Sequence, residues 1–456
     1  MTALDIGKYI LPGKRAHLVG IGGVSMCPLA EVLRGKGVLV TGSDMKEGEL
    51  TKHLRALGID VRIGHSPENI GNADFLVRTA AVHDDNPEIA EARSRGIPVF
   101  ERAQAWGAIM REYPNALCIS GTHGKTTTTS MATHIAMAAG IDPTVMIGGT
   151  LPLLGAGHRV GRGGTIILES CEYCDSFLQF FPTIAVILDV DADHLDYFKD
   201  LEAVKASFRR FAGLVPEDGV VVVNADDPNA MEAVAPVNRR RITFGLREEA
   251  DVRAENICYH DGLPAFDVLY KGEFFAHIEL LVPGVHNILN ALAATASAIA
   301  LGLPAKAVTQ GLSTFSGAGR RFEFKGTCRG ADIYDDYAHH PSELHALLTM
   351  ARTLEYRRII CAFQPHTYTR TKALYDDFIR ELGLADLVFL AEIYAAREKN
   401  TIGISSRDLA RDIPGARHFA TLEELTGALR EIASPGDLIL TVGAGDIYKV
   451  GEALVR

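Results

Sequence analysis

The sequence has little that would anchor it to a membrane or cross-link it. No uninterrupted apolar stretch reaches the roughly 18 residues that a spanning helix needs, and the amino terminus, MTALDIGKYILPGKRAHLVGIGG, lacks the apolar core of a signal peptide. The 7 cysteines are odd in number and scattered, and the pair Cys171 and Cys174 has no second CxxC to complete a zinc site. This usage fits a reducing compartment better than a disulfide framework. We therefore predict a cytoplasmic protein that does not bind membranes.

Basic residues are also fewer than acidic ones. The chain carries 46 Lys and Arg against 57 Asp and Glu, which gives a formal net charge of −11 and an isoelectric point near 5.8. This balance argues against a nucleic-acid binder, although a local basic pocket can still hold an anionic substrate. With 47% hydrophobic and 23% charged residues, the composition is that of a soluble globular protein.

The order of apolar runs predicts an α/β fold of three domains in 456 residues. In the first, AHLVGIGG, a helical stretch and VLVTGSD follow one another as in a Rossmann-like doubly wound sheet. In the second, NALCIS and later apolar runs indicate a P-loop ATPase-like, mostly parallel sheet, to which 242–283 adds small antiparallel strands. The third alternates strands and helices again and is predicted to be Rossmann-like. We place the domains at 1–108, 109–318 and 319–456.

A glycine-rich loop between a predicted strand and a predicted helix is the strongest local signal. In such a loop, backbone N–H groups close on phosphate oxygens, the lysine reaches the β- and γ-phosphates, and the hydroxyl after it can bind Mg²⁺. Ile119 stands where a full P-loop has its first glycine, so a plain glycine turn is the alternative. The predicted nucleotide-binding residues are Gly121, Thr122, His123, Gly124, Lys125, Thr126 and Thr127.

Acidic side chains follow two predicted strands of the second domain. They would lie at the carboxyl edge of a parallel sheet, where open α/β sheets bind ligands. Carboxylates suit the hard cation that ATP chemistry requires. Each acid could instead be a solvated loop carboxylate, but its place beside a phosphate loop favours a metal site. The two groups are Glu169, Glu172 and Asp175, and Asp189, Asp191 and Asp193 with His194.

A second glycine loop, GIGGVS, ends the first predicted strand. It differs from the dinucleotide fingerprint GxGxxG because Ser25 takes the third glycine position. A simple turn, a nicotinamide dinucleotide site and a pocket for another diphosphate compound all fit it. An NAD(P)-dependent oxidoreductase is therefore an alternative function, although it leaves the GKT loop unexplained. A nucleotide-binding scaffold without catalysis is another.

Taken in order, the motifs resemble the Mur ligase family over nearly the whole chain. GIGGVSMCPLAEVL and TGSD are similar to its UDP-binding segment, GTHGKTTTT to its ATP loop, and LESCEYCDSF and DADHLDYF to its metal and substrate segments. PGVHNILNALAA is similar to its adenine-contacting helix start, and GAGRRFE to the junction before its last domain. DDYAHHPSEL and FQPHTYTRT resemble the domain that receives an amino acid.

The resemblance implies roles for individual residues. At the ATP site it implies contacts with adenine by His286, Asn287 and Asn290, and with the nucleotide from the last domain by Arg320 and Asp336. It implies Mg²⁺ ligands, direct or through water, at Thr126, Glu169 and His194. It implies that the residues near the UDP substrate are Gly22, Gly23, Ser25, Asp44, His65 and Glu172. It implies an amino-acid site of Tyr337, His339 and Arg370, where a guanidinium suits a carboxylate. The implied catalytic residues are Lys125, Glu169, His194 and His339.

Considered without the family, several of these residues have simpler interpretations. His286 and Asn290 could cap or pack a helix, and His339 could belong to a helix entry before Pro341. His65 could be an exposed loop histidine, and Tyr337 a packed aromatic.

The resemblance further implies an ATP-dependent carboxylate–amine ligase of peptidoglycan synthesis, with ATP and Mg²⁺ as cofactors. The carboxylate of UDP-N-acetylmuramate would become an acyl phosphate, and L-alanine would displace the phosphate. The alternative within the family is the ligase that adds a preformed tripeptide to the same nucleotide. A monomer or homodimer is expected.

Two positions depart from the family pattern. Thr367 stands where many members have arginine. Phe208, with Lys205 one turn earlier, stands where several have a carbamylated lysine, so we do not predict that modification.

Overall fold

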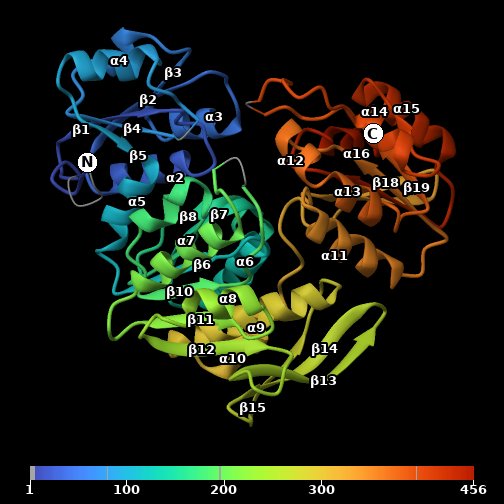
Figure 1. The fold of residues 1–456 in the computed structure, drawn as a ribbon. Coiled ribbons are helices and arrows are strands. Elements are labelled where there is room, and N and C mark those ends of the chain that lie inside the picture. Colours follow the sequence, from blue (N-terminus) through green and yellow to red (C-terminus); the bar gives the residue numbers. More distant parts are fainter. Residues whose placement is uncertain (1–5, 80, 195–196, 397) are drawn as a thin grey trace.

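The protein, seen here as a computed structural model, is described at residues 6–79, 81–194, 197–396 and 398–456. Within these residues, three sheets follow one another along the chain, with 5, 10 and 6 strands, and helices pack against them (Figure 1). The predicted α/β fold with three sheets is confirmed. The predicted limits at 108/109 and 318/319 fall between the sheets and stay a prediction.

The first sheet is parallel, in the order β3-β2-β1-β4-β5. Its strands are β1 (Arg15–Val19), β2 (Leu39–Asp44), β3 (Asp60–Ile63), β4 (Phe75–Arg78) and β5 (Val99–Glu101). Its helices are α2 (Met26–Gly35), α3 (Glu49–Ala56), the 3₁₀ turn η1 (Pro67–Ile70), α4 (Pro87–Ser94) and α5 (Arg102–Met110). Because all its strands run the same way, the glycine loop after β1 and the end of β2 share one edge.

The central sheet has the order β15-β14-β13-β12-β11-β10-β6-β9-β7-β8. Its strands are β6 (Asn115–Ser120), β7 (Thr144–Leu151), β8 (Ala156–Arg159), β9 (Thr165–Glu169), β10 (Ile184–Ile187), β11 (Val220–Asn224), β12 (Arg240–Gly245), β13 (Val252–His260), β14 (Leu263–Tyr270) and β15 (Glu273–Glu279). Its helices are α6 (Lys125–Ala138), η2 (Pro152–Leu154), η3 (Tyr173–Gln179), α7 (Leu201–Gly213), α8 (Pro228–Val234), α9 (Val285–Ala300) and α10 (Ala305–Leu312).

One limit of the predicted antiparallel addition is wrong. The prediction began it at residue 242, but β12 pairs in parallel with β11, and antiparallel pairing starts only between β13 and β14. The hairpin of β7 and β8 at the other edge was not predicted.

The third sheet has the order β16-β17-β21-β18-β19-β20, and all its pairs except β16–β17 are parallel. Its strands are β16 (Glu323–Cys328), β17 (Ala331–Asp336), β18 (Arg358–Phe363), β19 (Leu387–Leu390), β20 (Arg417–His418) and β21 (Asp437–Val442). Its helices are α11 (Pro341–Arg352), α12 (Tyr368–Ala373), α13 (Tyr375–Leu382), α14 (Ser406–Asp412), α15 (Leu422–Ile432) and α16 (Tyr448–Leu454).

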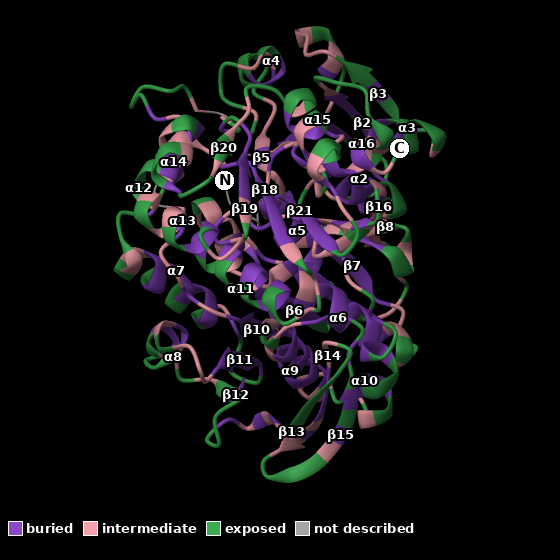
Figure 2. Ribbon diagram, turned by 90° about the vertical axis from the view of Figure 1, so that its right-hand side faces the viewer, coloured by how far each residue is buried: buried purple, intermediate pink, exposed green. Residues whose placement is uncertain are grey.

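Small side chains allow helices to pack tightly against the central sheet. The buried face of α9 is rich in alanine, and a Cβ at Gly311 of α10 would lie 2.6 Å from the Cα of Ile135 in α6. The central strands are buried on both faces, as their continuous apolar runs predict (Figure 2). Each buried valine of β11 contributes roughly 1.5–3 kcal/mol to stability. This packing holds the carboxyl ends of β6, β9 and β10 in place, where the predicted site lies.

All seven cysteines carry free thiols. Within the described part of the chain, no helix combines the length and the apolar character required to cross a membrane.

Candidate active site

The phosphate loop joins the end of β6 to the start of α6, and two of its glycines are required by its geometry. Gly124 has a left-handed φ of +77°, and a Cβ there would lie 2.6 Å from Oδ1 of Asn290. Gly121 has a φ of +146°, and a Cβ there would lie 2.8 Å from the Cβ of Leu188. Only glycine adopts these positions without strain. Among the described residues, no side chain caps the start of α6, so its backbone N–H groups can bind an anion.

Lys125, the first residue of α6, is held by a carboxylate. Its Nζ lies 3.1 Å from Oε2 of Glu172 and also donates to the carbonyls of Thr122 and Gly121. The two side chains are only 14% and 2% exposed. Burial alone would lower the pKa of Lys125, but Glu172 raises it above its ordinary value, so the ammonium keeps its charge. A phosphate would therefore meet a cation that is already in position.

Thr126 and Glu169 place two oxygen-bearing side chains, both able to bind a metal ion, next to this lysine. The Thr126 hydroxyl donates to Glu169 at 3.0 and 3.1 Å, and the N–H of Gly148 donates to the same carboxylate at 2.6 Å. A hydroxyl and a carboxylate at the end of a parallel strand suit Mg²⁺, which prefers oxygen ligands. The donor set present therefore fits the predicted cation.

His194 lies beside Glu172, the carboxylate that pairs with Lys125. Its Nε2 is 3.7 Å from Oε1 of Glu172 and 3.8 Å from Oδ2 of Asp193, and its ring centroid is 4.7 Å from that of Tyr173. A nitrogen in this place contacts a Mg²⁺ ion less readily than an oxygen does. The predicted motif DADHLDYF also includes residues 195 and 196, which lie outside the described residues.

His123 of the phosphate loop links the central unit to the third one. Its backbone N–H donates to Asp189 at 2.8 Å, and its ring nitrogens lie 3.7 Å from Asp191 and 3.3 Å from Glu343. Burial alone would lower the pKa of His123, but these three carboxylates raise it well above its ordinary value. Ser342 also donates to Asp191 at 2.9 Å. Glu343 is not among the residues predicted from the sequence, where the capping box that it forms at the start of α11 was its only local signal.

A cavity of about 300 Å³ lies beside the loop. It is lined by Gly124 and Thr127 on one side and by the three residues predicted to face adenine. Asn290 accepts from Thr128 at 3.1 Å and donates to Asn287 at 3.2 Å, and burial lowers the pKa of His286 to about 4. A neutral imidazole and fixed amides among apolar side chains suit a heteroaromatic ring.

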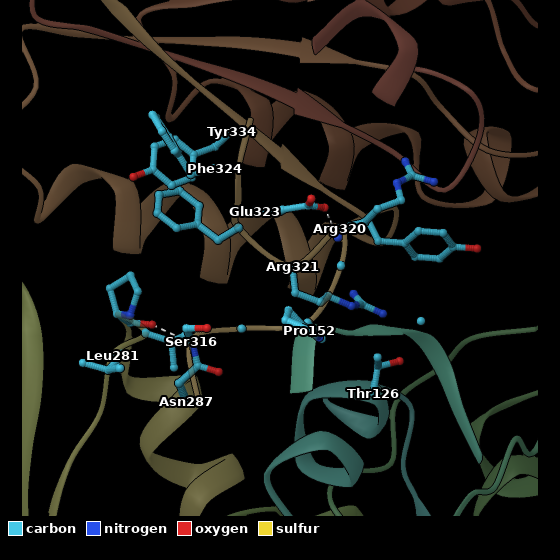
Figure 3. A pocket seen from close by; sticks show the side chains of 18 of the residues that line it. Thr126, Pro152, Leu281, Asn287, Ser316, Arg320, Arg321, Glu323, Phe324 and Tyr334 are labelled. Carbon is cyan, nitrogen blue, oxygen red and sulfur yellow. Dashed lines mark hydrogen bonds between the residues drawn. The ribbon is translucent and has the colours of Figure 1, made fainter. Parts of the chain in front are cut away.

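A larger cleft of about 1370 Å³ opens between the central and third units (Figure 3). Thr126 and Glu169 line one side, and Arg320, Arg321 and Tyr337 line the other. The lining residues labelled in Figure 3 thus come from both units.

Arg320, which was predicted to reach the nucleotide from the third unit, lines the large cleft but not the adenine cavity. Its guanidinium donates to Asp335 at 2.9 Å and to the carbonyl of Gly445 at 3.2 Å, and lies over the rings of Tyr337 and Tyr448. The next residue, Arg321, lines both the cleft and the adenine cavity. The motif GRRFE thus places two arginines beside the predicted nucleotide site, and the contact of Arg320 with the nucleotide stays a prediction.

The predicted amino-acid residues meet around Asp193. The Arg370 guanidinium donates to Asp193 at 2.8 Å, and its Nη1 lies 3.3 Å from Nδ1 of His366. The ring centroid of His339 is 5.5 Å from that of Tyr337 and 5.9 Å from that of His366. Burial is the main reason that the pKa of His339 falls to about 4. These side chains come from two units, so the site is completed only where the units meet.

In the first unit, the loop after β1 is tied to the end of β2. The N–H of Gly22 donates to Asp44 at 2.9 Å, where a Cβ would collide with that carboxylate, and Gly23 donates to the carbonyl of Gly20. Arg102 donates to the hydroxyl of Ser25. The loop is thus compact, with Gly22, Gly23, Ser25 and Asp44 together.

His65 lies in a different setting. Its Nδ1 is 3.0 Å from the hydroxyl of Ser43 and 3.3 Å from the buried Glu88, which also approaches His17. Burial raises the pKa of Glu88, but hydrogen bonds from its neighbours outweigh this and lower it to about 2. His65 is thus not the exposed loop histidine of the simpler interpretation; it packs against a buried carboxylate.

Phe208 and Lys205, at and before the position where several relatives have a carbamylated lysine, lie in different settings. Phe208 is fully buried, with its ring centroid 5.4 Å from that of Phe177. Lys205 pairs with Glu202 and Glu232 at 3.0 and 2.9 Å.

Models of the Mur ligase family match all three parts of the chain. The catalytic-domain model matches residues 15–114, the middle-domain model 119–298, and the glutamate ligase domain model 320–445. A relative from Clostridium novyi, a UDP-N-acetylmuramate–L-alanine ligase, is 46% identical over 447 residues, which are 97% of each chain. The chain belongs to the Mur ligase family. The predicted family and the predicted ligase class are both confirmed.

Solved structures agree with this Mur ligase fold. The UDP-N-acetylmuramate–alanine ligase of Thermotoga maritima is 30% identical, covers 97% of this chain and 98% of its own, and superimposes with a TM-score of 0.81. A murein peptide ligase of Psychrobacter arcticus, at 23% identity, covers 97% of this chain and 98% of its own with a TM-score of 0.73, which concerns the fold alone. The oxidoreductase alternative has no support from these relatives.

Replacing Asp336 of this Mur ligase by asparagine is expected to change how stability depends on pH. Asp336 lines the adenine cavity and accepts from the N–H groups of Phe322 and Ala338, both at 2.7 Å. Burial raises its pKa from 3.8 to about 6, so its contribution to stability is present below the unfolded pKa and is lost as the pH rises through the folded one. The free energy of unfolding of Asp336→Asn, relative to that of the wild type, should therefore rise by up to about 3 kcal/mol from about pH 4 to pH 7.5. Urea unfolding at the two pH values measures this change.

Asp437 provides a control, because the pKa of its carboxyl is shifted in the opposite direction. It is buried, but Arg358 and Arg357 outweigh burial and lower the pKa of its carboxyl. Its contribution is present above the unfolded pKa and is lost as the pH falls. The range from about pH 4 to pH 7.5 lies above both pKa values of Asp437, so the stability difference between Asp437→Asn and the wild type should stay nearly constant over it. An Asp336→Asn difference that is the same at both pH values would contradict the buried, raised carboxyl.

Proposed function

We propose that this Mur ligase joins L-alanine to the carboxylate of UDP-N-acetylmuramate, with ATP as the phosphoryl donor. The products are UDP-N-acetylmuramoyl-L-alanine, ADP and phosphate. The observation that carries the proposal is the full-length likeness to UDP-N-acetylmuramate–L-alanine ligases, at 42–47% identity over at least 96% of the chain. The phosphate loop, with a buried lysine beside a threonine–glutamate pair, supports it with the chemistry that such a ligase needs.

The first step is attack of the muramate carboxylate on the γ-phosphate of ATP, which gives an acyl phosphate and ADP. The loop N–H groups and Lys125 hold the phosphates and offset the charge that develops on the transferred group. The Mg²⁺ ion that such chemistry uses would be held by Thr126 and Glu169, with His194 nearby, and would supply further positive charge. Adenine would occupy the cavity of His286, Asn287 and Asn290.

In the second step the amine of L-alanine attacks the acyl carbon. The bond to the phosphate oxygen breaks, phosphate leaves with the electron pair, and the amine loses a proton. Arg370 would bind the alanine carboxylate beside Tyr337. The low pKa of His339 keeps its imidazole neutral, so one ring nitrogen can accept a hydrogen bond from the amine.

The arrangement of the units also suits a reactive intermediate. Water would hydrolyse an acyl phosphate, and the large cleft is lined from two units. Closure of that cleft on bound ATP would exclude water and bring Arg321 and Asp336 against the nucleotide.

The remaining predictions become part of the same proposal. Residues 1–108 would bind the UDP substrate through the loop of Gly22, Gly23, Ser25 and Asp44, with His65 and Glu172 nearby. Residues 109–318 would bind ATP, and 319–456 the amino acid. A cytoplasmic monomer or homodimer fits these roles.

Phosphate release tests the function directly. With ATP, Mg²⁺ and UDP-N-acetylmuramate present, release should depend on L-alanine, and mass spectrometry should find the nucleotide heavier by one alanyl residue. In separate reactions, L-alanine is replaced by each other amino acid and by the tripeptide L-alanyl-γ-D-glutamyl-meso-diaminopimelate. Release only with the tripeptide would select the recycling ligase instead.

A further inference from the structure

Four side chains with metal-binding atoms converge away from the phosphate loop, where the first unit meets the central sheet. Cys27 and Glu31 lie one turn apart on the same face of α2, His53 is on α3, and His158 is on β8. One ligand atom from each lies within 4.8 Å of all the others. In Figure 1, α2 lies directly beside β8. Residues from three elements and two units therefore share one point.

Glu31 is the centre of this cluster. Its Oε1 is 2.7 Å from Nε2 of His158, 2.9 Å from Nε2 of His53 and 3.9 Å from Sγ of Cys27. Two imidazole nitrogens thus point at one carboxylate oxygen. Ligand atoms of a tetrahedral zinc ion, at about 2.0–2.3 Å from the metal, lie roughly 3.3–3.8 Å apart. Shifts of about 1 Å or less would bring the four atoms to that spacing.

The kinds of atom present select the kind of ion. One sulfur, two imidazole nitrogens and one carboxylate oxygen are the ligands of Zn²⁺ and similar transition metals, whereas Mg²⁺ and Ca²⁺ prefer oxygen. Cys27 is buried and the His158 side chain is 9% exposed, which shields the site. The His53 side chain is 47% exposed and leaves a path for entry.

We propose that Cys27, Glu31, His53 and His158 form a site for Zn²⁺ or a similar divalent transition-metal ion between the first and central units. The Glu31 carboxylate and the Cys27 thiolate together balance the two charges of the ion. Binding releases the Cys27 proton to solvent, and each histidine binds as a neutral imidazole through Nε2 with its remaining ring proton on Nδ1. The site does not depend on the proposed ligase reaction.

The position of α2 gives the ion a structural consequence. This helix starts directly after the GIGGVS loop, so an ion that joins α2 to β8 would hold that loop at a set distance from the central sheet. A bound ion is therefore a clamp between two units, and it should stabilise the folded chain by mass action.

Cobalt is the probe, because Co²⁺ occupies such sites and absorbs light. The purified full chain is freed of metal with a chelator and titrated with Co²⁺ in excess Mg²⁺, without nucleotide. We expect one Co²⁺ per chain, with the visible bands of tetrahedral cobalt and a sulfur-to-cobalt charge-transfer band. The sulfur band separates this site from the cluster of His123, Asp191 and His340, which has no sulfur.

Two variants and a matched control complete the test. Cys27→Ser should abolish the sulfur band, and His158→Gln should weaken binding by at least about 100-fold, since loss of even an outer-shell partner costs 10–100-fold. Cys258→Ser is the control, because Cys258 is exposed and its Sγ lies 3.6 Å from Nε2 of His260. It should leave the spectrum unchanged. Circular dichroism verifies that each variant is folded.

Thermal unfolding gives a second readout if Cys27→Ser does not fold. Zn²⁺ should raise the unfolding midpoint of the wild type above its value in chelator, and the exposed substitution His53→Gln should reduce that rise. The absence of a sulfur band from the wild type, its persistence in a folded Cys27→Ser, or an equal rise in His53→Gln would each overturn the proposal. None of these results depends on ATP turnover, so the ligase function stands or fails separately.

Discussion

Replacing Lys125 by methionine is expected to reduce turnover at saturating ATP by about 1,000-fold or more. Methionine keeps much of the volume of the side chain but removes the cation that offsets charge on the transferred phosphoryl group. Loss of a single such preorganised donor costs about 100- to 1,000-fold in other enzymes, and the lysine of a phosphate loop carries a full charge. The measurement is the initial rate of phosphate release with L-alanine as acceptor.

The same substitution should also destabilise the fold, and the two effects can be separated. Glu172 is 2% exposed and would lose the ammonium 3.1 Å away, which costs about 3–5 kcal/mol when a buried pair is broken. Lys125→Met with Glu172→Gln should recover most of that stability, measured by urea unfolding, and still lack turnover. If the double variant regained near-normal turnover, the role of Lys125 at the phosphates would be wrong.

The predictable parts of this fold were those encoded in neighbouring residues. The loop before α6 was found because glycine, lysine and threonine at fixed spacing describe one local geometry, which the left-handed φ of Gly124 then shows. The buried strands were found from their apolar runs. The residue at which parallel pairing gives way to antiparallel pairing was not predicted. The apolar and polar residues of β12 and β13 do not show which strand each one pairs with.

What the sequence could not supply were contacts between residues far apart in the chain. His123, Asp191 and Glu343 meet only because two units pack together. Arg320 and Arg321 are adjacent and chemically equal, and the left-handed φ of +59° at Arg320 sends their side chains to different places. No spacing rule predicts that turn. The convergence of α2, α3 and β8 on Glu31 is of the same kind.

Replacing Arg370 by alanine is expected to lower kcat/KM for L-alanine by about 100-fold, because a charge-assisted bond to a carboxylate is worth about 1.5–3 kcal/mol. In the structure this guanidinium is paired with Asp193 at 2.8 Å, and both side chains are nearly buried. The alanine carboxylate must therefore share or replace Asp193 as the partner of Arg370. A loss of activity alone would not distinguish that role from the loss of a pair that joins two units.

L-Alaninamide makes the distinction, since it keeps the attacking amine and lacks the carboxylate. If Arg370 binds the carboxylate, the wild type should prefer L-alanine strongly, and Arg370→Ala should lose that preference while using L-alaninamide nearly as well as the wild type does. A purely structural role predicts equal losses with both amines. Arg380→Ala is the matched control, because that arginine is 65% exposed on the neighbouring helix α13 and pairs with Asp377. Arg380→Ala should leave the preference for L-alanine over L-alaninamide unchanged. If only Arg370→Ala loses that preference, the alanine carboxylate binds to the Arg370 guanidinium.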